Sequence, residues 1–275
     1  MNKLLKYEIK DIWKTVATGL IILTILNVLV FLSYQLVGEG MFSGLKVTES
    51  GFGVQIKGVV GLGMILCYLA DISMVILAFI FGINIFRKDL YGDTGVMLLT
   101  VPRTGMQIVS AKLLTALLQF VIIFEISAYF LVMQTIGISK SIKSGEFTAA
   151  FWDATFGKLD AWMFFTVIFV LIFIWVIAAS YLAIAFSKSF FRKKNLRWLI
   201  TIGVFAGLAV IDTVVERLLE KHVPISFDPT LLLQNSSRAL TEGFQIGYAT
   251  LVFEALIIAA MLLGTAYLLD RKVEI

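Results

Sequence analysis

The chain has 275 residues, of which 59% are hydrophobic and 15% are charged, and its mean hydropathy is +0.94. These values exclude an ordinary soluble domain of this length and predict an integral membrane protein. The net charge of +4 does not indicate nucleic acid as a partner, because the basic residues lie in short loops between apolar runs. The single cysteine, Cys67, lies within an apolar run and is expected to pack as a small hydrophobic side chain.

The first predicted element is an amphipathic helix over residues 1–14. Leu5 and Ile9 alternate at helical spacing with lysines such as Lys6 and Lys10, so one face is apolar and the other is basic. This pattern is typical of a helix that lies in the membrane interface. A simple lipid anchor for the N-terminus is an equally open interpretation.

Six apolar runs follow, at residues 16–37, 59–86, 109–136, 162–186, 196–211 and 248–269. At about 1.5 Å rise per residue, most of them are long enough to cross a hydrocarbon core of about 30 Å. The first has no small-residue cleavage pattern after it, so we interpret it as a retained span. The fifth is short, and an amphipathic continuation over 212–222 is expected to complete it before Pro224. The predicted fold class is therefore an all-α integral membrane protein, a single transmembrane domain of residues 1–275 with six transmembrane helices.

The basic residues orient these predicted spans. The two termini and the loops 87–112 and 188–197 hold 15 of the 23 lysines and arginines. The positive-inside rule therefore places both termini in the cytoplasm of a multi-pass protein in the cell membrane, expected to be a bacterial plasma membrane. The largest external segment, 212–247, has room for short helices but for no core of its own.

Gly203 and Gly207 in the fifth span form a G-x-x-x-G pattern. Such a pair lets two helix backbones approach closely. Because the pattern is common, we interpret it as packing within the chain in preference to a contact between two copies.

The longest polar interruption on the predicted cytoplasmic face is the loop 87–112. It has basic residues at both ends and carries two aspartates, three glycines and a proline around the apolar run 96–99. Thr104 and Gln107 fit a capping box that starts the third membrane helix just after Pro102. Such a loop is suited to presenting a short helix to a partner protein, although a solvated loop would look much the same.

The segments 86–95, 98–102 and 112–114 resemble the loop between the second and third membrane helices of type-2, exporter-class ATP-binding-cassette permeases. In that family the loop forms a cytoplasmic coupling helix that docks on the ATPase subunit, and a comparable amphipathic N-terminal helix lies beside that subunit. The resemblance implies a coupling loop over residues 87–105. Its ATPase-coupling residues would be Arg87, Lys88, Asp89, Leu90, Tyr91, Gly92, Asp93, Met97, Leu98, Leu99 and Pro102. Many relatives carry an acidic residue where Thr94 stands, so the charge pattern of this docking surface departs from theirs.

The resemblance also implies a function and a set of partners. The chain would be the permease subunit of an ATP-driven exporter that moves a peptide, an antimicrobial compound or another amphipathic substrate, as in antimicrobial peptide resistance. It would form a dimer with a second permease, identical or related, and would bind two ATPase subunits on separate chains. ATP and Mg would be bound by those ATPase chains, and no cofactor by this one.

Motifs for catalysis by the chain itself are missing from the sequence. Lys158 is followed by Leu159 instead of Ser or Thr, and Trp152 stands where a phosphate-binding loop needs its first glycine. The single histidine, His222, excludes zinc-protease and paired-histidine phosphatase motifs. We therefore expect no enzyme activity, no catalytic residue and no metal site.

Three carboxylates lie inside predicted spans, namely Asp71, Glu125 and Glu254. An ionisable group at membrane depth is costly unless it is paired, protonated or near water, so each is a candidate functional residue. In one interpretation they line a translocation cavity and attract a cationic or amphipathic substrate. In the other they are protonated and tie helices together through neighbours such as Asn27, Gln119 or Ser127.

A different class of function remains open on the same residues. The chain would then be a stand-alone ion- or proton-coupled transporter, or a channel, that uses the three carboxylates as its relay. Against this stands the lack of an inverted repeat and of a pair of Gly- or Pro-broken helices in the sequence. A membrane sensor or scaffold that transports nothing is a third interpretation.

Overall fold

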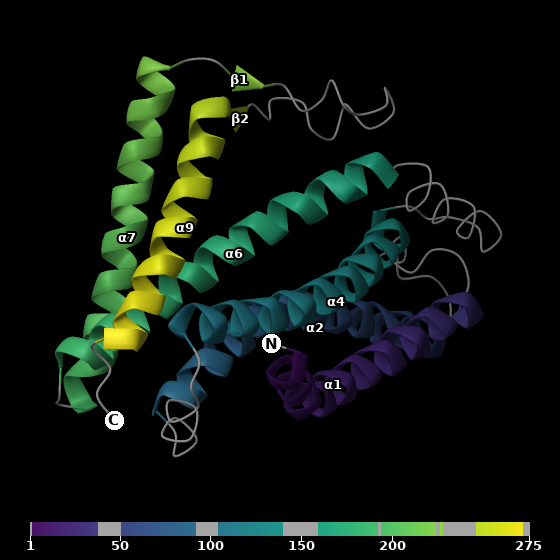
Figure 1. Cartoon of the computed structure of the whole chain (residues 1–275). Coiled ribbons are helices and arrows are strands. Elements are labelled where there is room, and N and C mark those ends of the chain that lie inside the picture. Colours follow the sequence, from purple (N-terminus) through teal and green to yellow (C-terminus); the bar gives the residue numbers. More distant parts are fainter. Residues whose placement is uncertain are drawn as a thin grey trace. The chain divides into compact units, whose positions relative to one another are not determined.

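The computed structural model of the chain describes residues 2–37, 51–91, 104–139, 159–191, 194–223, 226–227 and 246–271. These residues form six α-helices and one two-stranded sheet. In chain order they are α1 (Asn2–Val37), α2 (Gly51–Tyr91), α4 (Gly105–Ser139), α6 (Leu159–Phe190), α7 (Lys194–His222), β1 (Ser226–Phe227), β2 (Ile246–Gly247) and α9 (Tyr248–Arg271) (Figure 1).

Five stretches of helix are long and apolar enough to cross a membrane. They are Ile65–Tyr91, Gly105–Gln134, Trp162–Phe190, Leu196–His222 and Tyr248–Arg271. Helix α1 contains a shorter apolar stretch, Val16–Leu29, so the described residues hold five helices of spanning length where the sequence predicts six. The predicted helical membrane architecture is confirmed at this level, and the small β1–β2 sheet is an addition to it.

Helix α1 runs without a break from Asn2 to Val37. The segment that the sequence places in the membrane interface is therefore not a separate helix. It continues directly into the apolar run that follows, because no proline or glycine interrupts the chain between the two. The location of this segment in the interface stays a prediction.

The start of α4 follows the predicted capping box. Helix α4 begins at Gly105, and the N–H of Gln107 donates to Thr104 Oγ1 at 3.4 Å and to the Thr104 carbonyl at 2.9 Å. Thr104 thus satisfies a donor that the first turn of a helix leaves without an intrahelical partner. The predicted position of this helix start is confirmed.

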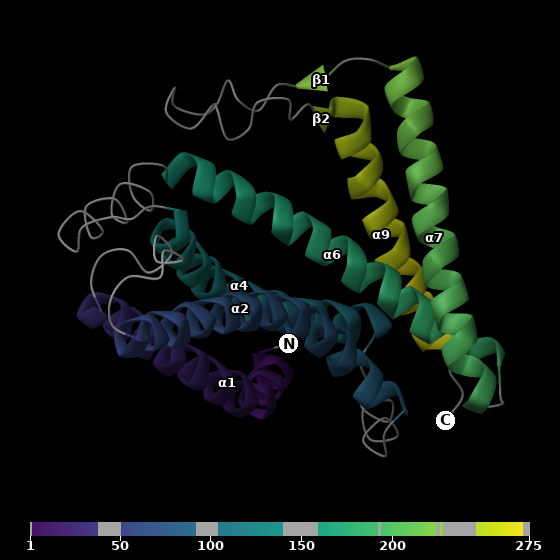
Figure 2. The same cartoon turned by 180° about the vertical axis from the view of Figure 1, so that it is seen from behind.

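Helix α7 reaches His222, so residues 212–222 continue the fifth apolar run as predicted. The rest of the predicted external segment includes residues 228–245, which lie outside the described ones. Strands β1 and β2 pair antiparallel, with Ser226 opposite Gly247 and Phe227 opposite Ile246. They connect to neighbouring ends of α7 and α9, which lie side by side in Figure 1 and in the view from behind in Figure 2.

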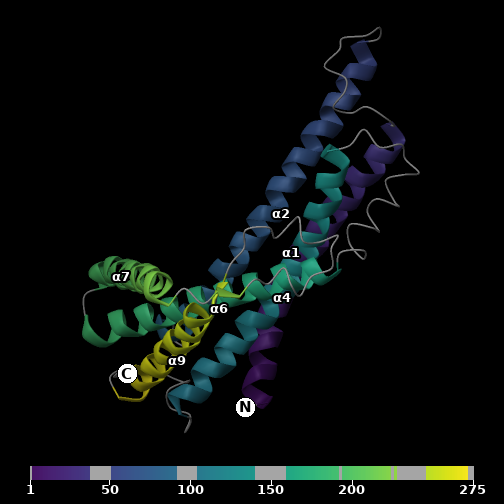
Figure 3. The ribbon, with the colours of Figure 1, turned by 90° about the horizontal axis from the view of Figure 1, so that it is seen from above.

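The chain divides into two compact units. One contains Met1–Ile9, Phe79–Phe120 and Phe164–Ile275, and the other contains Lys10–Ala78 and Val121–Met163. Helices α2 and α4 therefore contribute a part to each unit. In the second unit, the later half of α4 runs beside α1 (Figure 3). The single transmembrane domain of the sequence interpretation stays a prediction.

An aromatic cluster forms part of the core of the first unit. The rings of Phe120 and Phe173 stack with centroids 4.1 Å apart, and Phe79 meets both of them edge-on at 5.2 Å. Edge-to-face and stacked pairs of this kind stabilise a core beyond the area that they bury. The cluster joins α2, α4 and α6 within this unit.

At Gly82, α2 lies very close to α6 within the same unit. A Cβ atom at this position would lie 2.8 Å from Ile177 Cδ1 and 3.1 Å from Phe173 Cζ, and both of these side chains are fully buried. By contrast, no atom of the described residues lies within 4 Å of such a Cβ at Gly203 or Gly207. The packing within the chain that the sequence interpretation expects for this G-x-x-x-G pair is not observed there.

These glycines make a matched pair for a stability test. Gly82→Ala is expected to lower the free energy of unfolding by about 1–3 kcal/mol, because two buried side chains have to move. Gly203→Ala is expected to leave it unchanged or to raise it, since alanine favours helix and meets no neighbour. Thermal unfolding of both variants in detergent measures the difference, and an equal loss in the two would contradict the packing around Gly82.

Candidate functional site

The centre of the predicted coupling loop lies outside the described residues. This part, residues 92–103, includes six of the predicted coupling residues, namely Gly92, Asp93, Met97, Leu98, Leu99 and Pro102. The other five, Arg87, Lys88, Asp89, Leu90 and Tyr91, form the C-terminal end of α2. The site is therefore built from the two helix ends that flank the loop, the end of α2 and the start of α4.

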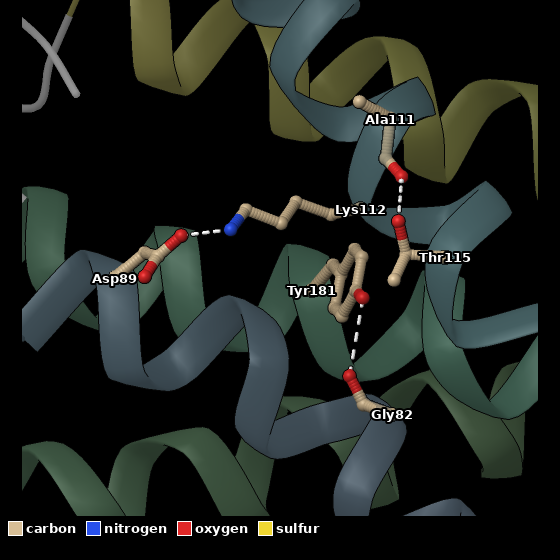
Figure 4. A network of polar contacts seen from close by, with 6 residues as sticks. All are labelled: Gly82, Asp89, Ala111, Lys112, Thr115 and Tyr181. Carbon is tan, nitrogen blue, oxygen red and sulfur yellow. Dashed lines mark hydrogen bonds and ion pairs between the residues drawn. The ribbon is translucent and has the colours of Figure 1, made fainter. Parts of the chain in front are cut away.

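A buried ion pair joins these two helix ends. Lys112 Nζ of α4 donates to Asp89 Oδ2 of α2 (Figure 4). The Lys112 side chain is 1% exposed and that of Asp89 is 18% exposed, so the lysine has almost no access to water. A buried cation without a counter-charge would be strongly destabilising, so the pair holds the end of α2 against α4. The sequence analysis predicts that Asp89 contacts an ATPase surface, whereas in the structure Asp89 forms an ion pair with Lys112 of the same chain.

A buried tyrosine fixes α6 next to this ion pair. Tyr181 donates its hydroxyl to the carbonyl of Gly82 at 3.1 Å (Figure 4). Its ring stacks on Phe86 with centroids 4.3 Å apart. Tyr181 is fully buried, so its hydroxyl requires a partner inside the protein. The same figure shows Thr115 donating to the carbonyl of Ala111, one turn earlier in α4.

The last turn of α2 also contacts α6 and α7. Lys188 Nζ donates to the carbonyl of Leu90, which satisfies one of the carbonyls left without a partner at a helix end. The hydroxyls of Tyr91 and Ser187 lie 3.0 Å apart, and Thr201 of α7 donates to the same Ser187 oxygen at 2.9 Å. Leu90 is buried, so this predicted coupling residue packs inside the chain.

Two cations flank the Tyr91 ring. Lys188 Nζ lies 5.9 Å and Arg197 Cζ lies 5.7 Å from the ring centroid. Both distances fall within the range of cation–π attraction. Because Arg197 belongs to α7 and Lys188 to α6, the ring of Tyr91 lies at a junction of three helices. Lys188 and Arg197, two basic residues of the predicted cytoplasmic segment 188–197, thus contact the end of the predicted coupling segment.

The other end of the loop is held by α9. The N–H of Gly105 donates to Asp270 Oδ1 at 2.6 Å. A carboxylate at the N-terminus of a helix is favourable, because the first N–H groups carry partial positive charge. A Cβ at Gly105 would lie 2.5 Å from the carbonyl oxygen of Ala266, so glycine is needed for this close approach. The sequence interpretation did not identify Asp270, since nothing local links it to α4.

Asp71 lies in a polar cluster inside the second unit. Its side chain is fully buried and accepts two hydrogen bonds, from Asn27 Nδ2 at 3.1 Å and from Gln134 Nε2 at 2.7 Å. Gln134 Nε2 also donates to Asn27 Oδ1. The cluster joins α1, α2 and α4, and its Asn27–Asp71 hydrogen bond is one that the helix-tying interpretation predicts. Gln134 was missed, and its only signal was a polar residue inside an apolar run.

Gln119 and Ser127, the two other residues expected to hydrogen-bond to the carboxylates, do not do so in the described part of the chain. The side-chain atoms of Gln119 and the hydroxyl of Ser127 are buried there without a hydrogen-bond partner. Glu125 instead accepts a hydrogen bond from Trp162 Nε1 at 2.8 Å. This contact joins α4 to α6 within the second unit.

Glu254 belongs to a cluster of carboxylates on α7 and α9. The carboxylate oxygens of Glu254, Asp212 and Glu216 lie within 4.8 Å of one another. The sequence interpretation placed Asp212 and Glu216 in the external segment and did not connect them with Glu254. Their spacing of four residues was the available signal, because it puts both side chains on one face of a helix.

No model of a known protein family, no curated protein and no solved structure matches the chain. The structure by itself defines the class of protein. Its helices of spanning length carry many exposed apolar side chains, such as Ile202, Val210 and Leu256. This architecture is that expected of a multi-pass helical membrane protein in contact with the lipid bilayer.

Substitution of the buried ion pair tests its contribution to stability. Lys112→Met is expected to lower the free energy of unfolding by about 2–3 kcal/mol, because it leaves the partly buried Asp89 carboxylate without its cation. The double variant Asp89→Asn with Lys112→Met is expected to recover at least about half of that loss, since it buries no unpaired charge. Denaturant unfolding in mild detergent measures both, and equal losses in the single and double variants would show that the two side chains are not coupled.

Proposed function

We propose that the chain is the permease subunit of an ATP-driven exporter. The substrate is a peptide, an antimicrobial compound or another amphipathic molecule, and ATP and Mg are bound by ATPase subunits on separate chains. A second permease, identical or related, completes the dimer in the cell membrane. Both termini lie in the cytoplasm, and the first residues of α1 lie in the inner interface beside the ATPase.

The observation that carries this proposal is the anchoring of both ends of the predicted coupling loop. On one side, Asp89 binds Lys112 and the Leu90 carbonyl accepts from Lys188. On the other side, Gly105 donates to Asp270. A loop with unattached ends would deform when a partner protein moves against it and would not displace the helices. Packed helices with hydrogen-bonded ends instead move as units. Closure of an ATPase dimer against this loop would therefore displace α2, α4, α6 and α9.

The anchoring also divides the predicted coupling residues into two groups. Asp89 and Leu90 act as anchors inside the chain, because one is ion-paired and the other is buried. Arg87, Lys88 and Tyr91 are exposed at the end of α2. We assign these three, together with the predicted loop residues that lie outside the described ones, to the docking surface for the ATPase.

Co-purification tests the docking surface. The tagged chain is purified from its native membrane in mild detergent, and a docking variant carries Arg87→Glu, Tyr91→Ala and Asp93→Ala. The matched control carries Lys221→Ala and His222→Ala, two exposed residues at the opposite end of α7. We expect an ATPase with the wild type and the control, and at least about tenfold less of it with the docking variant, because exposed aromatic and arginine side chains dominate such interfaces.

Two results would overturn the proposal. One is a wild-type complex that stays intact through purification and contains no ATPase. The other is retention of the ATPase by the docking variant at the level of the control. In the first case a stand-alone ion- or proton-coupled transporter becomes the better explanation, and the close approach of Asp212, Glu216 and Glu254 is the observation that favours it.

Neutralisation of the three predicted carboxylates separates transport from assembly. A variant with Asp71→Asn, Glu125→Gln and Glu254→Gln is expected to lose most ATP-dependent uptake of a fluorescent cationic peptide into inside-out vesicles. It should still co-purify with the ATPase, because none of the three residues belongs to the predicted docking surface. Glu220→Gln, an exposed change on α7, is the control. Loss of assembly together with unchanged uptake would contradict the predicted role.

A further inference from the structure

Three carboxylates, Asp212, Glu216 and Glu254, form a close group among the described residues. Asp212 and Glu216 lie four residues apart on α7, and Glu254 lies in the second turn of α9. Oxygens from all three lie within 4.8 Å of one another. Both helices belong to the first compact unit, so the arrangement is internal to one packed body.

Asp212 is an unusual member of this trio because it is buried and one of its carboxylate oxygens has no hydrogen-bond donor within the described residues. Its side chain is 9% exposed and points toward the two glutamates, and its Oδ1 atom has no hydrogen-bond donor in the described residues. The indole Nε1 of Trp175 in α6 lies beside Asp212 and interacts with its carboxylate, yet both Nε1 and Oδ1 fall short of full hydrogen-bond geometry. A buried carboxylate oxygen without a well-placed donor is costly, and a bound cation would satisfy it.

The charges around the trio also favour a cation. The charged groups that act on Glu254 are Asp212 and Glu216, and those that act on Glu216 are Asp212 and Glu220, so all of them are acidic. No lysine or arginine forms an ion pair with the trio within the ranges that the structure describes. Like charges at this separation require protons or a cation between them. A proton shared by Glu216 and Glu254 would still leave Asp212 Oδ1 without a partner.

We propose that Asp212, Glu216 and Glu254 bind a divalent cation. Three carboxylate oxygens from two helices form the donor set that hard cations such as Ca²⁺ and Mg²⁺ prefer, with water completing the coordination shell. The β1–β2 pairing connects the neighbouring ends of α7 and α9 and limits how far the two helices can separate (Figure 1). The bound ion would tie α7 to α9. This inference holds whether or not an ATPase binds the chain.

Terbium luminescence tests the site on the purified full chain in detergent. Tb³⁺ replaces Ca²⁺ at oxygen sites, and the adjacent Trp175 indole should sensitise its emission. We expect saturable emission that Ca²⁺ or Mg²⁺ displaces. Each of Asp212→Asn, Glu216→Gln and Glu254→Gln should weaken Tb³⁺ binding by at least about tenfold, because each removes one charged ligand.

Two control variants make the test specific. Glu220→Gln removes an exposed carboxylate on the same helix and should change the affinity by less than about twofold. Trp175→Phe should remove most of the sensitised emission while calorimetry shows unchanged Ca²⁺ affinity. In addition, saturating Ca²⁺ should raise the thermal midpoint of the wild type and of Glu220→Gln, but not that of the triple carboxylate variant.

Two outcomes would overturn the proposal of a cation site. One is a folded wild type without saturable Tb³⁺ emission or Ca²⁺-dependent stabilisation. Another is binding that Glu220→Gln weakens as much as the trio variants do, since this would show attraction to surface charge only. If one of the single carboxylate variants fails to fold, the Tb³⁺ affinities of the other two test the site. Unchanged Tb³⁺ affinity in a folded variant would show that the substituted residue is not a ligand.

Discussion

The buried contact between Asp89 and Lys112 is the interaction on which the described helix ends depend. A lysine that is 1% exposed has no access to water, so its ammonium must find a carboxylate inside the protein. This requirement brings the end of α2 to the start of α4. The Lys188 contact to the Leu90 carbonyl and the Asp270 contact to the Gly105 N–H then join the same region to α6 and α9. The charge pair and these two hydrogen bonds together connect four helices around the predicted cytoplasmic loop.

The buried carboxylates Asp71 and Asp212 differ in how their oxygens are satisfied. Asp71 accepts bonds from two side-chain amides, which makes it a complete internal contact between three helices. Asp212 is also buried, yet its Oδ1 has no donor in the described residues, and its neighbours Glu216 and Glu254 are acidic. A satisfied carboxylate stabilises the fold, whereas an unsatisfied one favours a ligand. For this reason the carboxylates on α7 and α9 are better candidates for binding a ligand than Asp71.

The G-x-x-x-G pair of helix α7 shows that this spacing alone does not produce close helix packing. Its Gly203 and Gly207 lie on a surface where no described atom approaches, while Gly82 of α2, which belongs to no such pattern, is tightly enclosed. Close packing at Gly82 therefore comes from the buried side chains of Phe173 and Ile177, whereas the G-x-x-x-G spacing of Gly203 and Gly207 produces no such contact among the described residues. Lipid or another protein chain would cover the exposed apolar surface of α7 in a membrane.

The sequence by itself determined the features that depend on local order. Runs of apolar residues predict the long helices, Thr104 with Gln107 predicts the start of α4, and the stripe over 212–222 predicts the length of α7. Asp71, Glu125 and Glu254 were recognisable as candidates because charge inside an apolar run is costly wherever it folds. Only the tertiary structure decided the pairings, such as Lys112 with Asp89, Gln134 with Asp71, and Glu254 with Asp212 and Glu216. Each of these depends on which faces of distant helices meet, and no local spacing along the chain encodes that.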